Sequence, residues 1–159
     1  MVLIKKVIVL IVVVFICSVT SGCREQNIDI QASPTFKSGI YTLQGTEGKI
    51  GILAPGDFIS NKPNKYMWHF WGAKEELART PFKVEAIDLK TGIKHQVLIE
   101  GMGTPSKKFV WEYNYGLGGP NNGADAHLPS GLELPNPGKW KLDAYLGGEL
   151  FGSVVVNVR

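Results

Sequence analysis

The chain has 159 residues, which is enough for one ordinary domain and too few for two independent hydrophobic cores. Its apolar content of 44% and charged content of 19% exclude a coiled coil and a wholly disordered chain. The formal net charge is only +3. Both cysteines, Cys17 and Cys23, lie near the N-terminus, so no disulfide framework can cross-link the remainder of the chain.

The first residues have the pattern of an export signal. Lys5 and Lys6 precede an unbroken apolar run over residues 7–17, and small residues follow it. A signal-peptide core has about 7–15 apolar residues, whereas a membrane-spanning helix needs about 20. The sequence therefore predicts a signal peptide over residues 1–22 and not a permanent anchor helix.

The segment Thr20-Ser21-Gly22-Cys23 resembles the lipobox of bacterial lipoproteins, although Thr20 stands where that family usually has leucine or another larger aliphatic residue. The resemblance implies cleavage before Cys23 and attachment of a diacylglyceryl group to its sulfur. Two acyl chains suffice for stable anchoring. The expected location is the extracytoplasmic face of the cell membrane, with the membrane as a partner through diacylglyceryl-cysteine and its palmitate-type chains. The alternative is an ordinary signal peptide followed by a free cysteine.

Several partners and chemistries are excluded for the mature chain. Loss of Lys5 and Lys6 leaves 15 basic residues against 14 acidic ones, a net charge of +1, so we expect no nucleic-acid partner. Acylation of Cys23 leaves no thiol. This excludes a cysteine nucleophile, an iron–sulfur site and a thiolate-ligated copper centre.

The mature chain divides into a tether and a β-rich domain. Residues 23–38 are polar and predict a lipidated tether, and residues 39–159 alternate short apolar runs with turn residues, which is typical of strands. The strand over residues 65–71 is bulky on both faces and is expected to be central. The predicted strands cover residues 40–43, 49–53, 65–71, 82–89, 94–99, 107–113, 132–134, 140–146 and 150–158.

The last two strands predict a hairpin with a three-residue loop over residues 147–149. This loop would pair Leu146 with Leu150 and bring the two apolar faces together, with Tyr145 and Phe151 as an outer cross-strand pair. So many short strands predict an antiparallel β-sandwich, with a closed barrel as the alternative. The pattern from Pro137 onward resembles the closing hairpin of bacterial immunoglobulin-like domains. That resemblance implies an all-β immunoglobulin-like sandwich with Trp68 or Trp140 as its core tryptophan.

Four segments together resemble a family of uncharacterised Gram-positive, Bacillus-type lipoproteins that contain a domain of unknown function. They are the lipobox, Asn-Lys-Tyr-Met-Trp-His-Phe-Trp-Gly at 64–72, Leu-Gly-Gly-Pro-Asn-Asn-Gly-Ala-Asp-Ala-His at 117–127, and the closing hairpin. The resemblance implies a cell-envelope location and a β-sandwich, and it carries no activity.

No catalytic motif of the metalloprotease, nucleophile-elbow or Ser-x-x-Lys type is present, so the expected protein is not an enzyme and needs no cofactor. His69 follows Met67 on the same strand face and is a weak metal-ligand candidate, as is His127. One histidine with one methionine is a poor metal signature, so ordinary packing is the favoured interpretation of His69.

The long segment over residues 114–130 is the strongest candidate for a binding loop. Asp125 and His127 alternate and would project to the same side of an extended backbone. Their alternative role is to satisfy backbone groups of tight turns. Candidate ligand-binding residues are Tyr115, Asn121, Asn122, Asp125 and His127. In the preceding aromatic row we expect Trp111 in the core and Tyr115 exposed.

The leading hypothesis is a lipid-anchored, non-enzymatic envelope module that binds a protein, a wall polymer or a small ligand. The alternative is a metal-binding protein, or a metal-dependent or acid–base enzyme, that uses His127 and Asp125 with His69 or His95. Convergence of two histidines and a carboxylate would favour the alternative.

Overall fold

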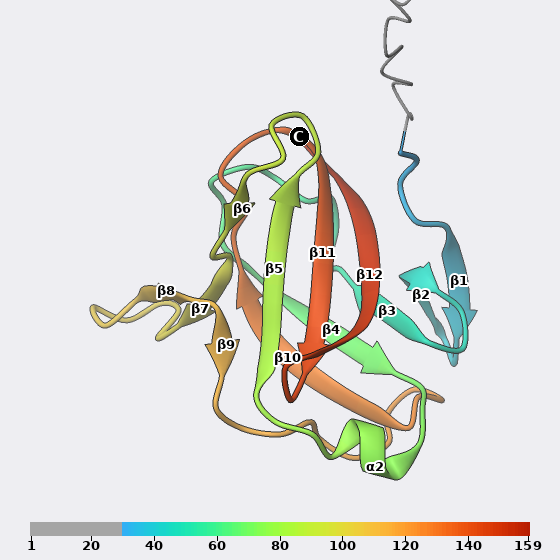
Figure 1. Cartoon of the computed structure of the whole chain (residues 1–159). Helices are drawn as coiled ribbons and strands as arrows, with labels where there is room; N and C mark the ends of the chain where they lie inside the picture. Colours follow the sequence, from blue (N-terminus) through green and yellow to red (C-terminus); the bar gives the residue numbers. More distant parts are fainter. Residues whose placement is uncertain (1–29) are drawn as a thin grey trace, which may run out of the picture.

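The computed structural model describes residues 30–159, which form two antiparallel β-sheets packed face to face (Figure 1). The seven-stranded sheet has the order β1-β2-β3-β4-β10-β7-β8, and the five-stranded sheet has the order β12-β11-β5-β6 with β9 paired to β5. Neither sheet closes on itself, so the barrel alternative is wrong and the two-sheet sandwich is confirmed. The strands of the first sheet are β1 (Thr35–Ser38), β2 (Tyr41–Thr46), β3 (Ile50–Leu53), β4 (Asn64–Phe70), β10 (Ala126–Leu132), β7 (Leu98–Glu100) and β8 (Lys108–Val110). Those of the second are β12 (Glu149–Val158), β11 (Gly138–Leu146), β5 (Phe82–Asp88), β6 (Lys94–His95) and β9 (Glu112–Tyr113).

The core lies between the sheets and is rich in aromatic rings. Strand β5 alternates as its sequence predicts, with Phe82 and Val84 fully buried and the intervening Lys83 half-exposed. Trp68 of β4 packs edge-on against Phe82 of the opposite sheet, with ring centroids 5.5 Å apart. The expected core tryptophan was Trp68 or Trp140, and the structure buries both completely.

The closing hairpin differs from its prediction. Strands β11 and β12 are joined by the two-residue turn Gly147-Gly148, which pairs Leu146 with Glu149 and Tyr145 with Leu150. A β-bulge after Ala144 then inserts one extra residue and restores the apolar register. Phe151 is consequently 5% exposed in the core, whereas Leu150 is 55% exposed. The predicted three-residue loop and the outer pair of Tyr145 with Phe151 are wrong because the bulge, and not the turn, corrects the phase.

Two predicted strands are each divided between the sheets. The run over residues 94–99 splits into β6 and β7, and the run over 107–113 splits into β8 and β9. In both cases the chain crosses from one sheet to the other. Hydrophobic alternation reports which side of a strand is buried and carries no information about which sheet the strand joins.

Strands β1 and β10 lie where irregular structure was expected. Strand β1 falls within the segment predicted as a tether and pairs with β2. Strand β10 replaces the last part of the predicted loop and the predicted strand over 132–134, and it pairs with β4 along seven residues. Pro129, Gly131 and the buried Ser130 obscure its pattern. Ser130 is nevertheless satisfied, because its Oγ accepts a hydrogen bond of 3.0 Å from Trp68 Nε1.

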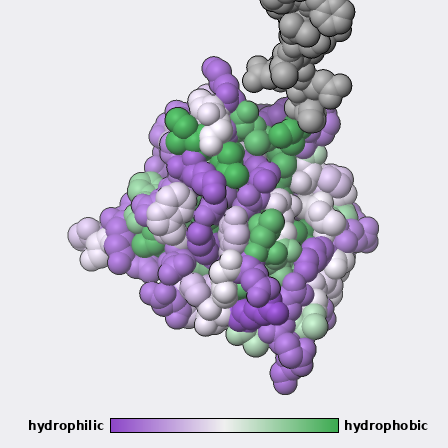
Figure 2. Space-filling model, in the orientation of Figure 1, coloured by the Kyte–Doolittle hydropathy of each residue, from purple (hydrophilic) through white to green (hydrophobic). Residues whose placement is uncertain are grey.

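The short helix α2 (Lys74–Leu77) lies at the end of the sandwich opposite residue 30 and the C-terminus (Figure 1). Hydrophilic residues cover most of the face seen in Figure 2, with small hydrophobic areas between them. Among residues 30–159, no helix has the length and apolar character needed to cross a bilayer. The expected signal peptide, Cys23 and the part of the expected tether that precedes residue 30 lie outside the described residues.

Candidate binding site

The segment between β9 and β10 is an ordered hairpin. Gly118 and His127 exchange two backbone hydrogen bonds of 2.8 and 3.2 Å, and Asn121 and Ala124 exchange two of 3.1 and 2.9 Å. At its tip, Asn122-Gly123 has φ values of +50° and +81°. Two consecutive positive φ values are what a tight two-residue hairpin turn requires, and Asn-Gly is a preferred pair for it. Local turn chemistry therefore orders much of the predicted loop.

Polar contacts fix the hairpin tip on the outer face of the seven-stranded sheet. The carbonyl of Asn122 accepts a hydrogen bond from Ser38 Oγ, and the carbonyl of Gly123 accepts one of 2.7 Å from Trp71 Nε1. Asn122 Nδ2 also donates to His69 Nε2 at 3.2 Å. Asn122 thus holds the hairpin against the sheet.

His69 is fully buried beneath this tip and both its ring nitrogens are occupied. Its Nδ1 lies 3.3 Å from the carbonyl of Met67 and donates to it, which leaves Nε2 to accept from Asn122. Burial lowers the pKa of His69, the Met67 bond opposes this effect, and nearby His127 lowers it further. A neutral His69 with both nitrogens bonded has none to offer a metal ion. The expectation that β4 is central and covered on both faces is confirmed here.

Asp125 and His127 do not pair with each other. The Asp125 carboxylate accepts a hydrogen bond of 3.0 Å from the backbone N–H of Gly72, and His127 Nδ1 donates to the carbonyl of Gly119 at 2.7 Å. A Cβ on Gly118 would lie 2.8 Å from His127 Cε1, so a glycine is needed where the imidazole packs. Both side chains thus secure the ends of the hairpin.

The histidines do not converge on a carboxylate. His95 lies on β6 in the other sheet, where its ring packs edge-on against Trp140 at 5.2 Å. Within residues 30–159, no group of three or more His, Cys, Asp or Glu side chains could hold a metal ion. His69 and His127, the two weak metal-ligand candidates, therefore belong to no such group among the described residues.

The buried His69 predicts acid-sensitive stability. Its folded pKa is below the unfolded value of about 6.5, so the unfolded chain binds the proton more readily as pH falls. The contribution of neutral His69 to the free energy of unfolding is therefore fully present above pH 6.5, and it is lost as the pH falls through the folded pKa. Urea unfolding at pH 7.5 and pH 5 should show a lower free energy of unfolding at pH 5, and His69→Gln should remove most of this difference. An unchanged pH difference in His69→Gln would assign it to other groups.

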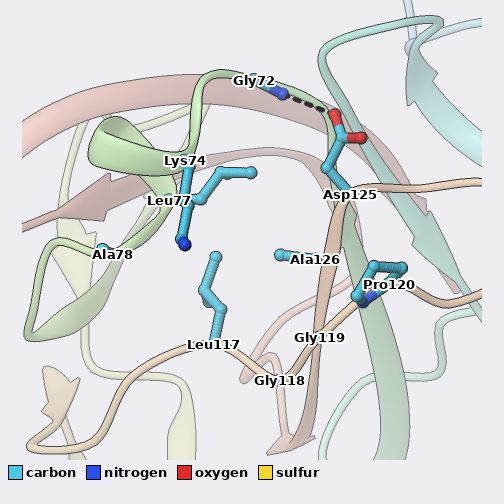
Figure 3. A pocket seen from close by; sticks show the side chains of 10 residues that line it. All are labelled: Gly72, Lys74, Leu77, Ala78, Leu117, Gly118, Gly119, Pro120, Asp125 and Ala126. Carbon is cyan, nitrogen blue, oxygen red and sulfur yellow. Dashed lines mark hydrogen bonds between the residues drawn. The ribbon is translucent and has the colours of Figure 1, made fainter.

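A pocket of about 490 Å³ lies between α2 and the first part of the hairpin (Figure 3). Its volume is in the range of small-molecule sites. Leu77 and Ala78 line it at the end of α2, and Leu117 and Pro120 line the facing segment. Leu77 is the one residue of α2 that is buried, because the rest of this helix is charged. The helix α2 therefore packs with its one apolar residue, Leu77, facing the hairpin.

Two charged groups lie at this otherwise apolar pocket. Lys74 extends from α2 into the space facing Leu117, as Figure 3 shows, and makes no ion pair within the described part of the chain. Asp125 lies at the rim beside Gly72, where one of its oxygens is already hydrogen-bonded. The unpaired ammonium is therefore available to an acidic group on a ligand.

Of the candidate residues, only Asp125 lines this pocket. Tyr115 is 54% exposed, as expected, and stacks on Tyr113 with centroids 5.1 Å apart. Asn121, Asn122 and His127 stabilise the hairpin instead. The sequence reasoning missed Lys74, Leu77 and Leu117. The available signal was that Leu77 is the one apolar residue after three charged ones in α2, and that Leu117 lies between two glycines. An isolated leucine in such a polar or glycine-rich segment indicates a local apolar contact.

A family model described as a domain of unknown function, DUF4871, matches residues 23–156. The crystal structure described as "a Putative Lipoprotein from Bacillus anthracis" is 20% identical, covers 84% of this chain and 88% of its own, and has a TM-score of 0.67. These values show a shared fold. The Lin-41 filamin domain matches at 11% identity over 73% of this chain and 98% of its own, with a TM-score of 0.41. No curated protein sequence matches the chain.

Proposed function

The chain belongs to the DUF4871 family, whose function is unknown, and we propose that it is a lipid-anchored protein on the extracytoplasmic face of the cell membrane whose sandwich is a non-enzymatic binding module. The lipobox at Cys23 and the likeness to the Bacillus anthracis structure support the anchored location. Residue 30 and the pocket lie at opposite ends of the sandwich, an arrangement suited to presenting the pocket away from the bilayer (Figure 1).

An immunoglobulin-like topology is part of this proposal. The order β12-β11-β5-β6 corresponds to strands G-F-C-C′ of an immunoglobulin sandwich, and β3-β4-β10-β7 corresponds to A-B-E-D. In this scheme the pocket lies beside the connection from B to C, which contains α2, and the connection that leads into E. Loops at one end of such a sandwich commonly carry its binding residues.

The observation that carries the proposed function is the pocket between α2 and the hairpin. It combines apolar walls with the unpaired ammonium of Lys74. Its ligand is a small molecule with an apolar body and an acidic group, because the apolar part is driven from water and the acidic part pairs with the lysine.

The dye anilinonaphthalene sulfonate has this chemistry and serves as a probe. Wild-type protein should bind it saturably with enhanced fluorescence. Lys74→Gln should weaken binding about two- to five-fold, the effect of one solvent-accessible ion pair, and Leu117→Gln should weaken it further by making one wall polar.

Lys90→Gln is the matched control, because Lys90 is also exposed and does not line the pocket. It should bind the dye as the wild type does. Equal dye binding by all four proteins would place the dye elsewhere and refute the proposed pocket.

A further inference from the structure

A second cleft, of about 500 Å³, lies where the chain leaves one sheet and joins the other. Strand β8 ends at Val110 in the seven-stranded sheet, and β9 begins at Glu112 in the five-stranded sheet. Figure 1 shows β7, β8 and β9 together on the side of the sandwich away from β1. Trp111 is the single residue between these strands and lines the cleft.

Trp111 differs from the other three tryptophans in its surroundings. The indole N–H groups of Trp68, Trp71 and Trp140 donate to Ser130 Oγ, the Gly123 carbonyl and the Asn136 carbonyl, respectively. Within residues 30–159, the Trp111 indole has neither a hydrogen-bond acceptor nor a ring partner. It is 36% exposed, which corrects the expectation of a core position. The bend between the sheets interrupts the alternation on which that expectation rested.

A second aromatic ring and several polar side chains lie in the same cleft. Phe109 is 41% exposed and, like Trp111, lines it. The side chains of Gln96, Glu112 and Asn114 also line it and make no hydrogen bond or ion pair with the described residues. The cleft therefore offers exposed aromatic surface beside an indole donor, two amides and a carboxylate.

Most charges of the cleft are neutralised within the protein. Glu85 pairs with Lys83 and Lys94, at 2.6 Å each, and Lys108 pairs with Glu100 at 2.8 Å. Among the described residues that line the cleft, both cations, Lys83 and Lys108, are paired, so neither is left to recruit a phosphate or another anion. The groups left for a ligand are the aromatic side chains, the indole N–H, the two amides and the Glu112 carboxylate.

We propose that this cleft binds a neutral saccharide, with Trp111 as the residue on which a sugar ring stacks. A pyranose presents C–H groups on its face and hydroxyl groups around its edge. The C–H face packs on an aromatic ring, and the hydroxyls exchange hydrogen bonds with amides and a carboxylate in the manner of Gln96, Asn114 and Glu112. This site shares no lining residue with the α2 pocket, so either proposal can fail alone.

The test uses the full chain in detergent with two neutral probes, a β-1,4-linked N-acetylglucosamine tetramer and maltotetraose. At least one should bind saturably at millimolar or lower concentration and shift tryptophan emission to the blue. Trp68 and Trp140 are fully buried, and Trp71 is bonded to Gly123 and does not line the cleft, so the shift should come from Trp111. Trp111→Ala should weaken binding about ten-fold, as expected for loss of stacking together with one hydrogen bond.

Two variants control for damage to the fold. Trp111→Phe keeps an aromatic face and should retain binding within about three-fold, without the emission shift. Tyr41→Ala removes another exposed aromatic side chain that does not line the cleft, and it should bind as the wild type does. The proposal is overturned if neither tetramer binds saturably, or if Trp111→Ala binds as tightly as Tyr41→Ala. Strong weakening by salt would also overturn it, because it would indicate an ionic ligand.

Discussion

A Cys23→Ser variant is expected to incorporate no radiolabelled palmitate and to lose its stable association with membranes. The thioether of a diacylglyceryl group requires the cysteine sulfur, and a serine hydroxyl does not accept the group by the same chemistry. One acyl chain gives marginal, reversible membrane binding and two chains give stable anchoring. Removal of both chains should therefore move the protein into the alkaline-extractable fraction, as measured by immunoblotting of membranes washed with carbonate.

Cys17→Ser is the matched control, because Cys17 is the other cysteine of the chain and lies within the apolar run of the signal. This variant should incorporate palmitate like the wild type. If the Cys23→Ser variant remained as firmly membrane-bound and labelled as the wild type, the proposed anchor and its location would both be wrong.

A Trp68→Ala variant is expected to lose about 3–5 kcal/mol of stability, which is a large part of the stability of an ordinary domain. Trp68 is fully buried at the centre of the sandwich and contacts Phe82 of the opposite sheet edge-on. Its removal opens a cavity between the sheets. It also deprives the buried Ser130 Oγ of its donor. Urea unfolding monitored by circular dichroism measures the loss.

Two substitutions separate these contributions. Trp68→Phe keeps most of the apolar contact but not the indole N–H, so it should cost clearly less than Trp68→Ala. Trp111→Ala removes the same side chain from an exposed position and should change stability by less than about 1 kcal/mol. Comparable losses for Trp68→Ala and Trp111→Ala would show that the core is not organised around Trp68.

Strand content could be read from the chain because alternation is a local property. Successive side chains of a strand point to opposite faces of the sheet. In β5, the buried Phe82 and Val84 therefore alternate with Lys83 and Glu85, as expected. Strand β10 could not be read in this way. Its Pro129 and Gly131 weaken the pattern, and its pairing with β4 joins residues about 60 positions apart in sequence.

The candidate site could likewise be predicted only where it depends on local sequence. The hairpin tip Asn122-Gly123 has local turn chemistry, so turns in this segment were predictable. Lys74 and Leu117, in contrast, are separated by more than forty residues and meet only because α2 and the hairpin lie at the same end of the sandwich. No pattern within either segment indicates that the other faces it.

The sequence by itself determined the expectation of export and lipidation, because short linear signals are read before the chain folds, and it determined the strand-rich character of the domain, because burial of one strand face requires alternation. Only the tertiary structure decided which strands share a sheet, that a bulge corrects the closing hairpin, that His69 is bonded at both nitrogens, and that Trp111 lies in a cleft. Each of these depends on contacts between distant residues, whose free energy is gained only when the two sheets pack together.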